Sequence, residues 1–258
     1  MIQLPNQPHP CPVCQGAATP YDVVDFNKSC VEERGVFLTH SGIPIYYFLC
    51  PSCGFLFAPE FGVWTTEDFS RFIYNADYHR VDPDFDGTRA KVNAEGLLKL
   101  FPDYQGIRHL DYGGGDGQLS RILQSAGWDS TSYDPYAGND KQLPEGARFN
   151  LITSFEVFEH VADPHPLLAS LTSRLADPGL LLFSTMLSDG HLQRPRRIDW
   201  WYISPRNGHI SIYATETLRT LAARYGYQCA SPRPILHLFW KHMPDWAADI
   251  RQRLESSP

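Results

Sequence analysis

The segment that most clearly carries chemistry is a glycine-rich run in the middle of the chain, His-Leu-Asp111-Tyr-Gly113-Gly-Gly115-Asp-Gly117. Glycine lets the backbone turn sharply and approach a ligand without a Cβ in the way. Four glycines in five positions would cost considerable backbone entropy in a plain turn. The pattern therefore predicts a binding site for a charged, adenosine-type ligand, formed by Asp111, Gly113, Gly115 and Gly117.

Other nucleotide sites also use glycine-rich turns. A P-loop requires Gly-Lys-Ser/Thr after the glycines, but Gly117 is followed by Gln118 and Leu119, which excludes it. A dinucleotide site fits better, yet Ser120 stands where a third glycine or alanine would pack the helix on the strand. The acid before the first glycine favours S-adenosylmethionine, because the ammonium group of that cofactor needs an anion nearby.

The elements around this run are those that would position such a cofactor. Residues 107–110 predict a buried strand, and residues 118–126 predict a helix that ends at a glycine. A second strand over residues 129–134 ends in Asp134, 23 positions after Asp111, where a carboxylate can accept both ribose hydroxyls. A third apolar strand, residues 149–155, leads directly into Glu156.

The order of these segments resembles the class I S-adenosylmethionine-dependent methyltransferases. Residues 156–164 are similar to the Glu-Val-Leu-Glu-His-Val-x-Asp-Pro signature of the small-molecule branch, residues 178–185 to its fifth strand, and residues 201–210 to its substrate loop. The resemblance covers residues 105–243. It implies a Rossmann-like α/β sheet with helices on both faces, S-adenosylmethionine as cofactor, and methyl transfer as the activity.

The chain departs from the family between its second and fourth strands. Only residues 135–148 lie there, and a full crossover takes a dozen or more residues before a strand is counted. We therefore expect the second helix to be missing and the third strand to be reduced or absent. The family's adenine contacts come from this region, so they are not assigned.

Four cysteines near the N-terminus form two Cys-x-x-Cys pairs: Cys11, Cys14, Cys50 and Cys53. Such pairs place four thiolates for a tetrahedral zinc, and a shell closed by four cysteines is structural. A disulfide framework is disfavoured by the lack of a secretory signal and by only six cysteines in 258 residues. A thioredoxin-type redox site would need one such pair at the start of a helix, and neither pair begins a helix in this sequence. The other cysteines, at positions 30 and 229, are expected to be isolated packing residues.

The composition narrows the range of partners. The formal net charge is −7 with a pI near 5.8, so the chain lacks the basic surface that a nucleic-acid partner requires. Its longest apolar stretch is too short to span a bilayer. We expect a cytoplasmic protein without a membrane or nucleic-acid partner. We also expect three parts: a zinc ribbon over residues 1–62, a helical lid or linker over residues 63–104, and an S-adenosylmethionine-binding domain over residues 105–258.

The lid region contains two stretches with helical apolar spacing, residues 66–78 and 89–101. We expect these helices to cover the cofactor and to link the ribbon to the core. Plain packing helices are an equally good interpretation for any single residue in them.

Catalytic candidates follow the strands of the sheet, because ligands of open α/β sheets bind outside the carboxyl ends. His160 and His209 could each accept a proton near neutral pH, and Tyr202 lies in the same aromatic insertion as His209. His160 could instead hold local geometry, and Glu156 could either face the methyl donor or favour a helix N-terminus. The insertion also carries three arginines that would suit an anionic substrate: Arg194, Arg196 and Arg197.

These residues predict transfer of a methyl group to an oxygen, or less favourably a carbon or nitrogen, of a small molecule. The first candidate acceptor is an anionic carbohydrate, such as a sugar or nucleotide-sugar hydroxyl. The alternatives are a non-enzymatic binding or scaffold module, or a methyltransferase that acts on nucleic acid or protein. The intact set of acidic and glycine residues argues against the scaffold interpretation.

Overall fold

The computed structural model describes residues 7–103, 105–135, 143–192 and 197–256. The chain separates into two compact units. The N-terminal unit comprises Met1–Pro83, Glu159–His165 and Met186–Leu221; the Rossmann-like unit comprises Asp84–Phe158, Pro166–Thr185 and Ala222–Pro258. These boundaries differ from the expected three-part division, because two segments from the second half of the chain pack with the N-terminal cysteine region.

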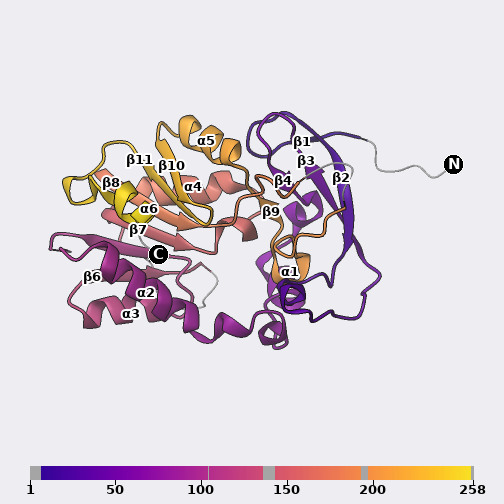
Figure 1. The fold of residues 1–258 in the computed structure, drawn as a ribbon, viewed down its shortest axis with the longest axis horizontal. Helices are drawn as coiled ribbons and strands as arrows, with labels where there is room; N and C mark the ends of the chain where they lie inside the picture. Colours follow the sequence, from indigo (N-terminus) through magenta and orange to yellow (C-terminus); the bar gives the residue numbers. More distant parts are fainter. Residues whose placement is uncertain (1–6, 104, 136–142, 193–196, 257–258) are drawn as a thin grey trace. The chain divides into compact units, whose positions relative to one another are not determined.

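The Rossmann-like unit is built on a six-stranded sheet of order β10-β11-β8-β7-β5-β6 (Figure 1). Strands β6, β5, β7 and β8 are parallel neighbours, whereas β11 runs antiparallel to β8 and β10 antiparallel to β11. The predicted Rossmann-like α/β sheet is thereby confirmed. The strands are β5 (Arg108–Tyr112), β6 (Asp129–Tyr133), β7 (Phe149–Phe155), β8 (Leu175–Ser184), β10 (Gln228–Arg233) and β11 (Leu236–Trp240).

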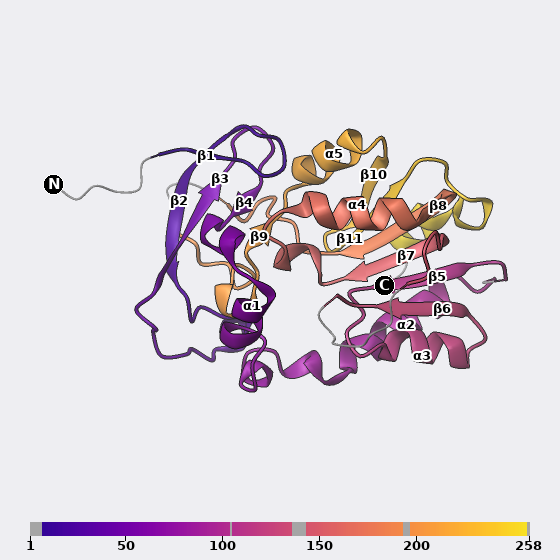
Figure 2. The same ribbon diagram turned by 180° about the vertical axis from the view of Figure 1, so that it is seen from behind.

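Helices cover both faces of this sheet. Figure 2 shows α2 (Thr88–Leu100) and α3 (Gln118–Ser125) on one face and α4 (Pro164–Arg174) on the other. Apolar side chains of α2 and α3 pack with Leu151 and Leu182 of the sheet, so α2 has a packing role, and a lid role for it stays a prediction. The remaining helices are α5 (Thr215–Arg224) and α6 (Ile250–Ser256).

Between β6 and β7 the described residues, 134–135 and 143–148, contain neither helix nor strand, in agreement with the expected shortening. No helix in the described part of the chain is both long and apolar enough to cross a membrane.

The N-terminal unit contains an antiparallel sheet of order β1-β2-β3-β4-β9. Its strands are β1 (His9–Pro10), β2 (Ala17–Asp25), β3 (Pro44–Leu49), β4 (Leu56–Phe57) and β9 (Ser211–Ile212). The last strand comes from the insertion after β8, so this unit is completed by residues far along the chain. Its core contains Tyr47, Phe61, Ile73, Tyr202 and Ile212.

The helix expected over residues 66–78 is shorter in the structure, where α1 spans Thr66–Phe72. Two carbonyl groups that a longer helix would use are bonded elsewhere. The Asn75 amide donates to the Arg71 carbonyl at 3.0 Å, and the Arg206 guanidinium donates to the Ile73 carbonyl at 2.9 Å. Short 3₁₀ helices follow at Tyr78–Arg80 and Pro83–Asp86. The apolar spacing predicted where α1 begins. It contains no information about side-chain donors that compete for the backbone carbonyls at the end of the helix.

Candidate cofactor and catalytic sites

The glycine-rich loop joins β5 to α3 and packs tightly against its surroundings. Gly113 has φ +80°, and a Cβ there would collide with the Val157 side chain. A Cβ on Gly114 would collide with Asp111 Oδ2 and Ser132 Oγ. The Gly113 N–H donates to the Tyr133 carbonyl at 2.8 Å, which ties the loop to the end of β6. The loop therefore needs glycine for its own packing as well as for the approach of a ligand.

Asp111 lies buried at the base of this loop. Thr153 Oγ1 donates to Asp111 Oδ1 at 3.2 Å, whereas Oδ2 is buried without a hydrogen-bond partner among the described residues. Ser132 Oγ on the neighbouring strand is buried in the same way. Burial raises the pKa of Asp111 to about 7, and the negative charge of Asp134 adds to the rise. A cationic group near the loop would stabilise the ionised carboxyl.

Asp134 and Glu156 follow the carboxyl ends of β6 and β7. Asp134 Oδ2 accepts a hydrogen bond from the Gly115 N–H at 2.9 Å. Glu156 adopts φ +54°, and its N–H donates to Ser184 Oγ at 2.9 Å while that hydroxyl donates to Glu156 Oε1 at 2.7 Å. A non-glycine residue held at positive φ is a feature of functional sites.

The six residues predicted from the sequence to bind the cofactor all lie in the Rossmann-like unit, within the last two residues of β5 or after the ends of β5, β6 and β7: Asp111, Gly113, Gly115, Gly117, Asp134 and Glu156. The donor set suits S-adenosylmethionine. Asp111 offers a buried carboxylate oxygen that a cationic group can bind. The glycines of the loop leave out the Cβ atoms that would block a ligand, and Asp134 follows the adjacent strand, where a carboxylate can accept from ribose hydroxyls.

The four predicted metal-binding cysteines converge in the N-terminal unit. Cys11 Sγ and Cys53 Sγ are 3.7 Å apart, Cys14 Sγ and Cys50 Sγ are 3.5 Å apart, and all four lie within 4.8 Å of one another. Sulfurs on a tetrahedral zinc are about 3.8 Å apart, given a Zn–S bond of about 2.3 Å. The Gly16 N–H also donates to Cys14 Sγ at 3.4 Å. The arrangement fits a tetrahedral metal ion.

A second polar cluster in the N-terminal unit joins the three predicted catalytic residues to a buried carboxylate. Glu159, His160 and His209 each place one potential ligand atom within 4.8 Å of the others. The Tyr202 hydroxyl donates to Glu159 Oε1 at 2.7 Å, and the Tyr74 hydroxyl lies 3.0 Å from His160 Nδ1. This histidine–glutamate cluster (Glu159, His160, Tyr202 and His209) could hold either a proton or a cation.

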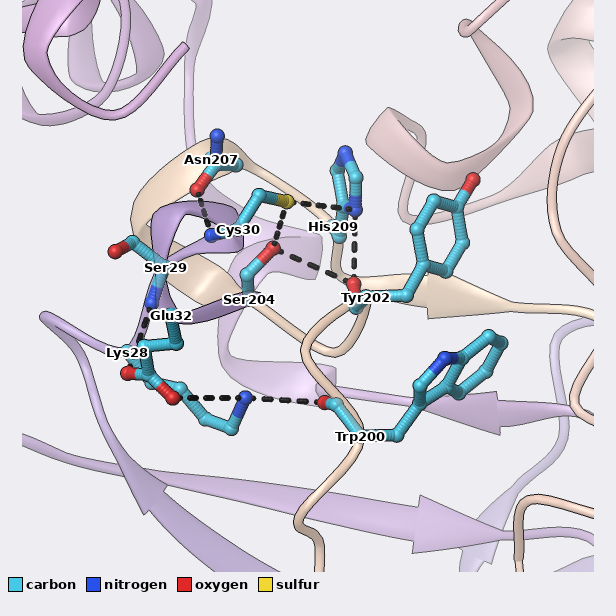
Figure 3. Close-up of polar contacts among 9 residues, drawn as sticks. All are labelled: Lys28, Ser29, Cys30, Glu32, Trp200, Tyr202, Ser204, Asn207 and His209. Carbon is cyan, nitrogen blue, oxygen red and sulfur yellow. Dashed lines mark hydrogen bonds and ion pairs between the residues drawn. The ribbon is translucent and has the colours of Figure 1, made fainter. Parts of the chain in front are cut away.

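Hydrogen bonds to both the backbone and the ring fix the orientation of His209. Its carbonyl accepts from the Tyr47 hydroxyl at 2.8 Å, and its Nδ1 lies 2.8 Å from the Tyr202 carbonyl (Figure 3). Because a carbonyl can only accept, Nδ1 carries the proton and the neutral ring keeps its lone pair on Nε2. His209 therefore presents a proton-accepting nitrogen on the side away from that carbonyl.

The N-terminal segment braces the loop that carries His209. The Lys28 ammonium donates to the Trp200 carbonyl at 3.0 Å, and the Cys30 N–H donates to Asn207 Oδ1 at 2.9 Å (Figure 3). Cys30 Sγ lies 3.0 Å from Ser204 Oγ and 3.8 Å from His209 Nδ1. The expectation that Cys30 is an isolated packing thiol was wrong, because the fold brings it to the insertion after β8.

Several aromatic and arginine side chains of the insertion after β8, which the sequence suggested as substrate contacts, are buried in the structure. Trp200 and Tyr202 are buried in the core of the N-terminal unit, so their faces are not open platforms. Arg206 is also buried, and burial lowers its pKa. Arg197 is exposed, whereas Arg194 and Arg196 lie outside the described residues.

Sequence reasoning missed several residues that now belong to these sites. Glu159 had a signal, since it is the second acid of the Glu-x-x-Glu-His motif, but no role was assigned to it. Thr153 and Ser184 gave no signal, because a lone hydroxyl in an apolar strand is common. Their partners become visible only when the parallel strands are aligned.

Comparison with known proteins gives the family. A family model described as a methyltransferase domain matches residues 85–231, more than half of the chain. The ubiquinone biosynthesis O-methyltransferase of Caulobacter sp. (strain K31) is 31% identical over 106 residues, which cover 32% of this chain and 42% of that relative. The chain thus matches less than half the length of this curated relative.

Similar solved structures include two methyltransferases. The plantazolicin methyltransferase BpumL in complex with SAH is 14% identical, with a TM-score of 0.46 over 67% of this chain and 93% of that chain. The mitomycin 7-O-methyltransferase MmcR is 16% identical, with a TM-score of 0.46 over 69% of this chain and 61% of that one. The family match over residues 85–231 agrees with the strand order and the glycine-rich loop described above. The chain therefore belongs to the methyltransferase domain family, with the class I S-adenosylmethionine-dependent fold.

Proposed function

We propose that the protein transfers the methyl group of S-adenosylmethionine to a hydroxyl group of a small molecule. The observation that carries this proposal is the arrangement of Asp111, the glycine-rich loop and Asp134 at the carboxyl ends of two adjacent parallel strands. In open α/β sheets this edge is where ligands bind. When bound, the cofactor supplies an electrophilic methyl carbon on a sulfonium sulfur.

We further propose that His209 is the proton acceptor for the acceptor hydroxyl. In this transfer the C–S bond of the bound cofactor would break as the new C–O bond forms, and His209 Nε2 would take up the hydroxyl proton. Support comes from the fixed Nδ1–H, which leaves Nε2 as a base, and from Glu159, whose negative charge would stabilise a protonated ring. In the chain, His160 follows the end of β7 by five positions.

Substitution of the histidines tests this role. His209→Ala should lower kcat by roughly two to four orders of magnitude while cofactor affinity stays nearly native, because the ring acts on the acceptor. The control is His191→Ala, which removes a histidine of the same insertion whose ring stacks on Trp200 with 4.0 Å between the ring centroids. Native turnover in His209→Ala together with an inactive His160→Ala would transfer the base role to His160.

A metal-chelator experiment shows whether the histidine–glutamate cluster accepts a proton or binds a metal cation during turnover. The same cluster could hold a divalent cation, so activity would then depend on added metal. We expect turnover to survive a chelator that does not remove the cysteine-bound metal. Loss of turnover that added magnesium or manganese restores would contradict the proton role.

The acceptor we propose is a small anionic molecule, with carbohydrates and nucleotide sugars as the first classes to test. Support comes from the exposed Arg197 and the half-buried Trp201 in the insertion, which suit an anionic group and a ring face. Release of S-adenosylhomocysteine measured against a panel of sugars, nucleotide sugars and phenols identifies the class. Turnover only with nucleic acid or protein substrates would overturn this proposal.

For the cysteine cluster we propose one zinc ion with a structural role. Four thiolates close the coordination shell, which leaves no position for a substrate or water. The cysteines of each pair lie in the turns between β1 and β2 and between β3 and β4, so the metal would join both turns. This zinc would stabilise the unit that carries the histidine–glutamate cluster.

A further inference from the structure

A buried histidine lies beneath the cofactor loop and belongs to none of the roles above. His109 in β5 is fully buried and lies two residues before Asp111, on the same face of the sheet. Its Nε2 is 2.9 Å from Thr153 Oγ1 and its Nδ1 is 2.8 Å from Ser130 Oγ. Thr153 Oγ1 in turn donates to Asp111 Oδ1 at 3.2 Å. The ring is therefore linked to the cofactor-site carboxyl through a single hydroxyl.

While Asp111 is ionised, the available hydrogens allow only one set of directions for the hydrogen bonds that link Asp111, Thr153 and His109. A carboxylate only accepts, so the single hydroxyl hydrogen of Thr153 points to Asp111. The Thr153 oxygen must then accept from His109 Nε2–H. Burial holds the pKa of His109 at about 3, so the ring is neutral and its other nitrogen, Nδ1, must accept from the Ser130 hydroxyl. That hydroxyl then has no hydrogen left for Ser120 Oγ, 3.0 Å away, so the Ser120 hydroxyl is the donor of that pair.

This arrangement explains how the Thr153 hydroxyl is held. A threonine hydroxyl can rotate toward other acceptors, but a ring N–H aimed at its oxygen restricts it to the Asp111 direction. The ring itself is fixed by Ser130 and by the edge of Trp128, whose centroid lies 5.9 Å away. Without the ring, the only hydrogen bond of the Asp111 carboxyl among the described residues, the one from Thr153, would no longer be directed.

We propose that His109 is a positioning residue for the cofactor site, because it fixes the Thr153 hydroxyl as a donor to Asp111 and so keeps that carboxyl ionised for the cofactor's ammonium group. This inference rests on the proposed function, since it assumes that an adenosine-type amino acid binds at the loop. It adds a residue whose side chain touches neither the cofactor nor the acceptor.

The surroundings of Asp111 indicate how the effect would be measured. Burial raises the pKa of this carboxyl to about 7, the Thr153 hydrogen bond opposes the rise, and the charge of Asp134 adds to it. The other groups that face it, Ser132 from β6 and the Gly114 backbone from the loop, are neutral. Loss of the directed hydrogen bond would raise the pKa further, so less of the protein would be competent to bind near neutral pH.

The test is a calorimetric titration of the full chain with S-adenosylhomocysteine between about pH 5.5 and pH 9. Below a pKa of about 7, native affinity should fall roughly tenfold per pH unit. Thr153→Val and His109→Leu should move the midpoint of this profile upward by about one unit and weaken binding near pH 7 by up to roughly tenfold. The conservative variants Thr153→Ser and His109→Gln should return the profile toward the native one.

A control ligand and a second measurement keep the test decisive. 5′-Methylthioadenosine lacks the amino-acid portion, so its affinity should not follow the same pH profile. Nitrogen-15 NMR of the native complex should show His109 as a neutral ring protonated at Nε2, which needs no variant to fold.

The outcomes separate the two proposals. If neither ligand binds the native protein at any pH, the cofactor assignment fails. If S-adenosylhomocysteine binds but Thr153→Val and His109→Leu keep the native pH profile, or if the ring is protonated at Nδ1, the positioning role of His109 fails while the cofactor assignment stands.

Discussion

At the scale of single residues, Gly113 is the position on which the cofactor loop depends most. A Cβ there would meet the Val157 side chain, and φ is +80°. We expect Gly113→Ala to destabilise the protein by roughly 2–4 kcal/mol, since both left-handed strain and a collision must be absorbed. Binding of S-adenosylhomocysteine should weaken by at least about tenfold. Denaturant unfolding and calorimetry measure the two effects.

Gly226 provides the matched control for this substitution. It has φ +72° but no atom within 4 Å of the position of a Cβ, so Gly226→Ala carries the backbone strain without the collision. It should cost only about 1–2 kcal/mol and leave cofactor affinity native. Equal effects of the two substitutions would show that the contact between Gly113 and Val157 has no special role.

Single residues also show what the sequence alone could and could not predict. The spacing of the cysteines and of the Asp111 motif is local, so it indicated both binding sites directly. His109 acts through partners on other strands, and nothing in its immediate neighbours distinguishes it from a packing residue. Glu159 stands in the Glu-x-x-Glu-His motif, but its partner Tyr202 lies 43 positions away in the chain. Cys30 was misread for the same reason, because Ser204 contacts it across 174 positions of sequence.

At the scale of elements, the sequence predicted strands correctly where the strand is buried on both faces of the sheet. The largely apolar segment of β7 predicted the strand over residues 149–155 that the structure shows, because a strand buried on both faces needs no strict alternation of apolar and polar residues. Helix α1 ended earlier than expected, since Asn75 binds the Arg71 carbonyl of its last turn and Arg206 binds the carbonyl of Ile73, the residue after the helix. Helix propensity cannot anticipate a donor such as Arg206, which lies 133 positions away in the chain.

The central strands also carry an acid-sensitive histidine. His237 in β11 lies 2.8 Å from the Thr185 carbonyl and 2.9 Å from Ser231 Oγ, and burial lowers its pKa to about 4. The unfolded chain binds a proton at this ring from about pH 6.5 downward, whereas the folded protein does not. Its contribution to stability is therefore complete above about pH 6.5 and is lost as the pH falls toward 4, by roughly 3 kcal/mol in all.

Replacement of this ring tests the acid sensitivity. His237→Gln should reduce but not abolish the slope of the free energy of unfolding against pH between about 4 and 6.5, because burial also holds the pKa of His109 low, at about 3. Urea unfolding at several pH values measures this slope. Ser231→Ala is the control, because it removes a partner of the ring but keeps the titrating group. A native slope in His237→Gln would assign the acid sensitivity to other residues.

At the scale of the whole molecule, the proposed zinc should stabilise one unit and not the other. Cys50→Ser should lower metal content from about one zinc per chain and speed hydrogen exchange in β1 to β4, because binding energy at such sites is folding energy. Exchange in β5 to β8 should remain slow, since that sheet has its own core. Elemental analysis and hydrogen-exchange mass spectrometry provide the two readouts.

Cys229→Ser serves as the control for the zinc prediction. Cys229 lies in β10 of the Rossmann-like unit and is not one of the four clustered thiols. Its replacement should leave zinc content and exchange in β1 to β4 unchanged. Native metal content in Cys50→Ser would contradict the zinc assignment.

The central claim, that this chain binds S-adenosylmethionine at the edge formed by β5 and β6, is tested most directly by calorimetric titration with that cofactor. The native protein should bind it, and Asp134→Ala should lose about tenfold or more in affinity, because charge-assisted hydrogen bonds to the ribose are each worth roughly 1.5–3 kcal/mol. Asp129→Ala removes the same charge at the opposite end of β6 and should bind as the native protein does. Absence of binding by the native protein, or equal affinities of the two variants, would contradict the account.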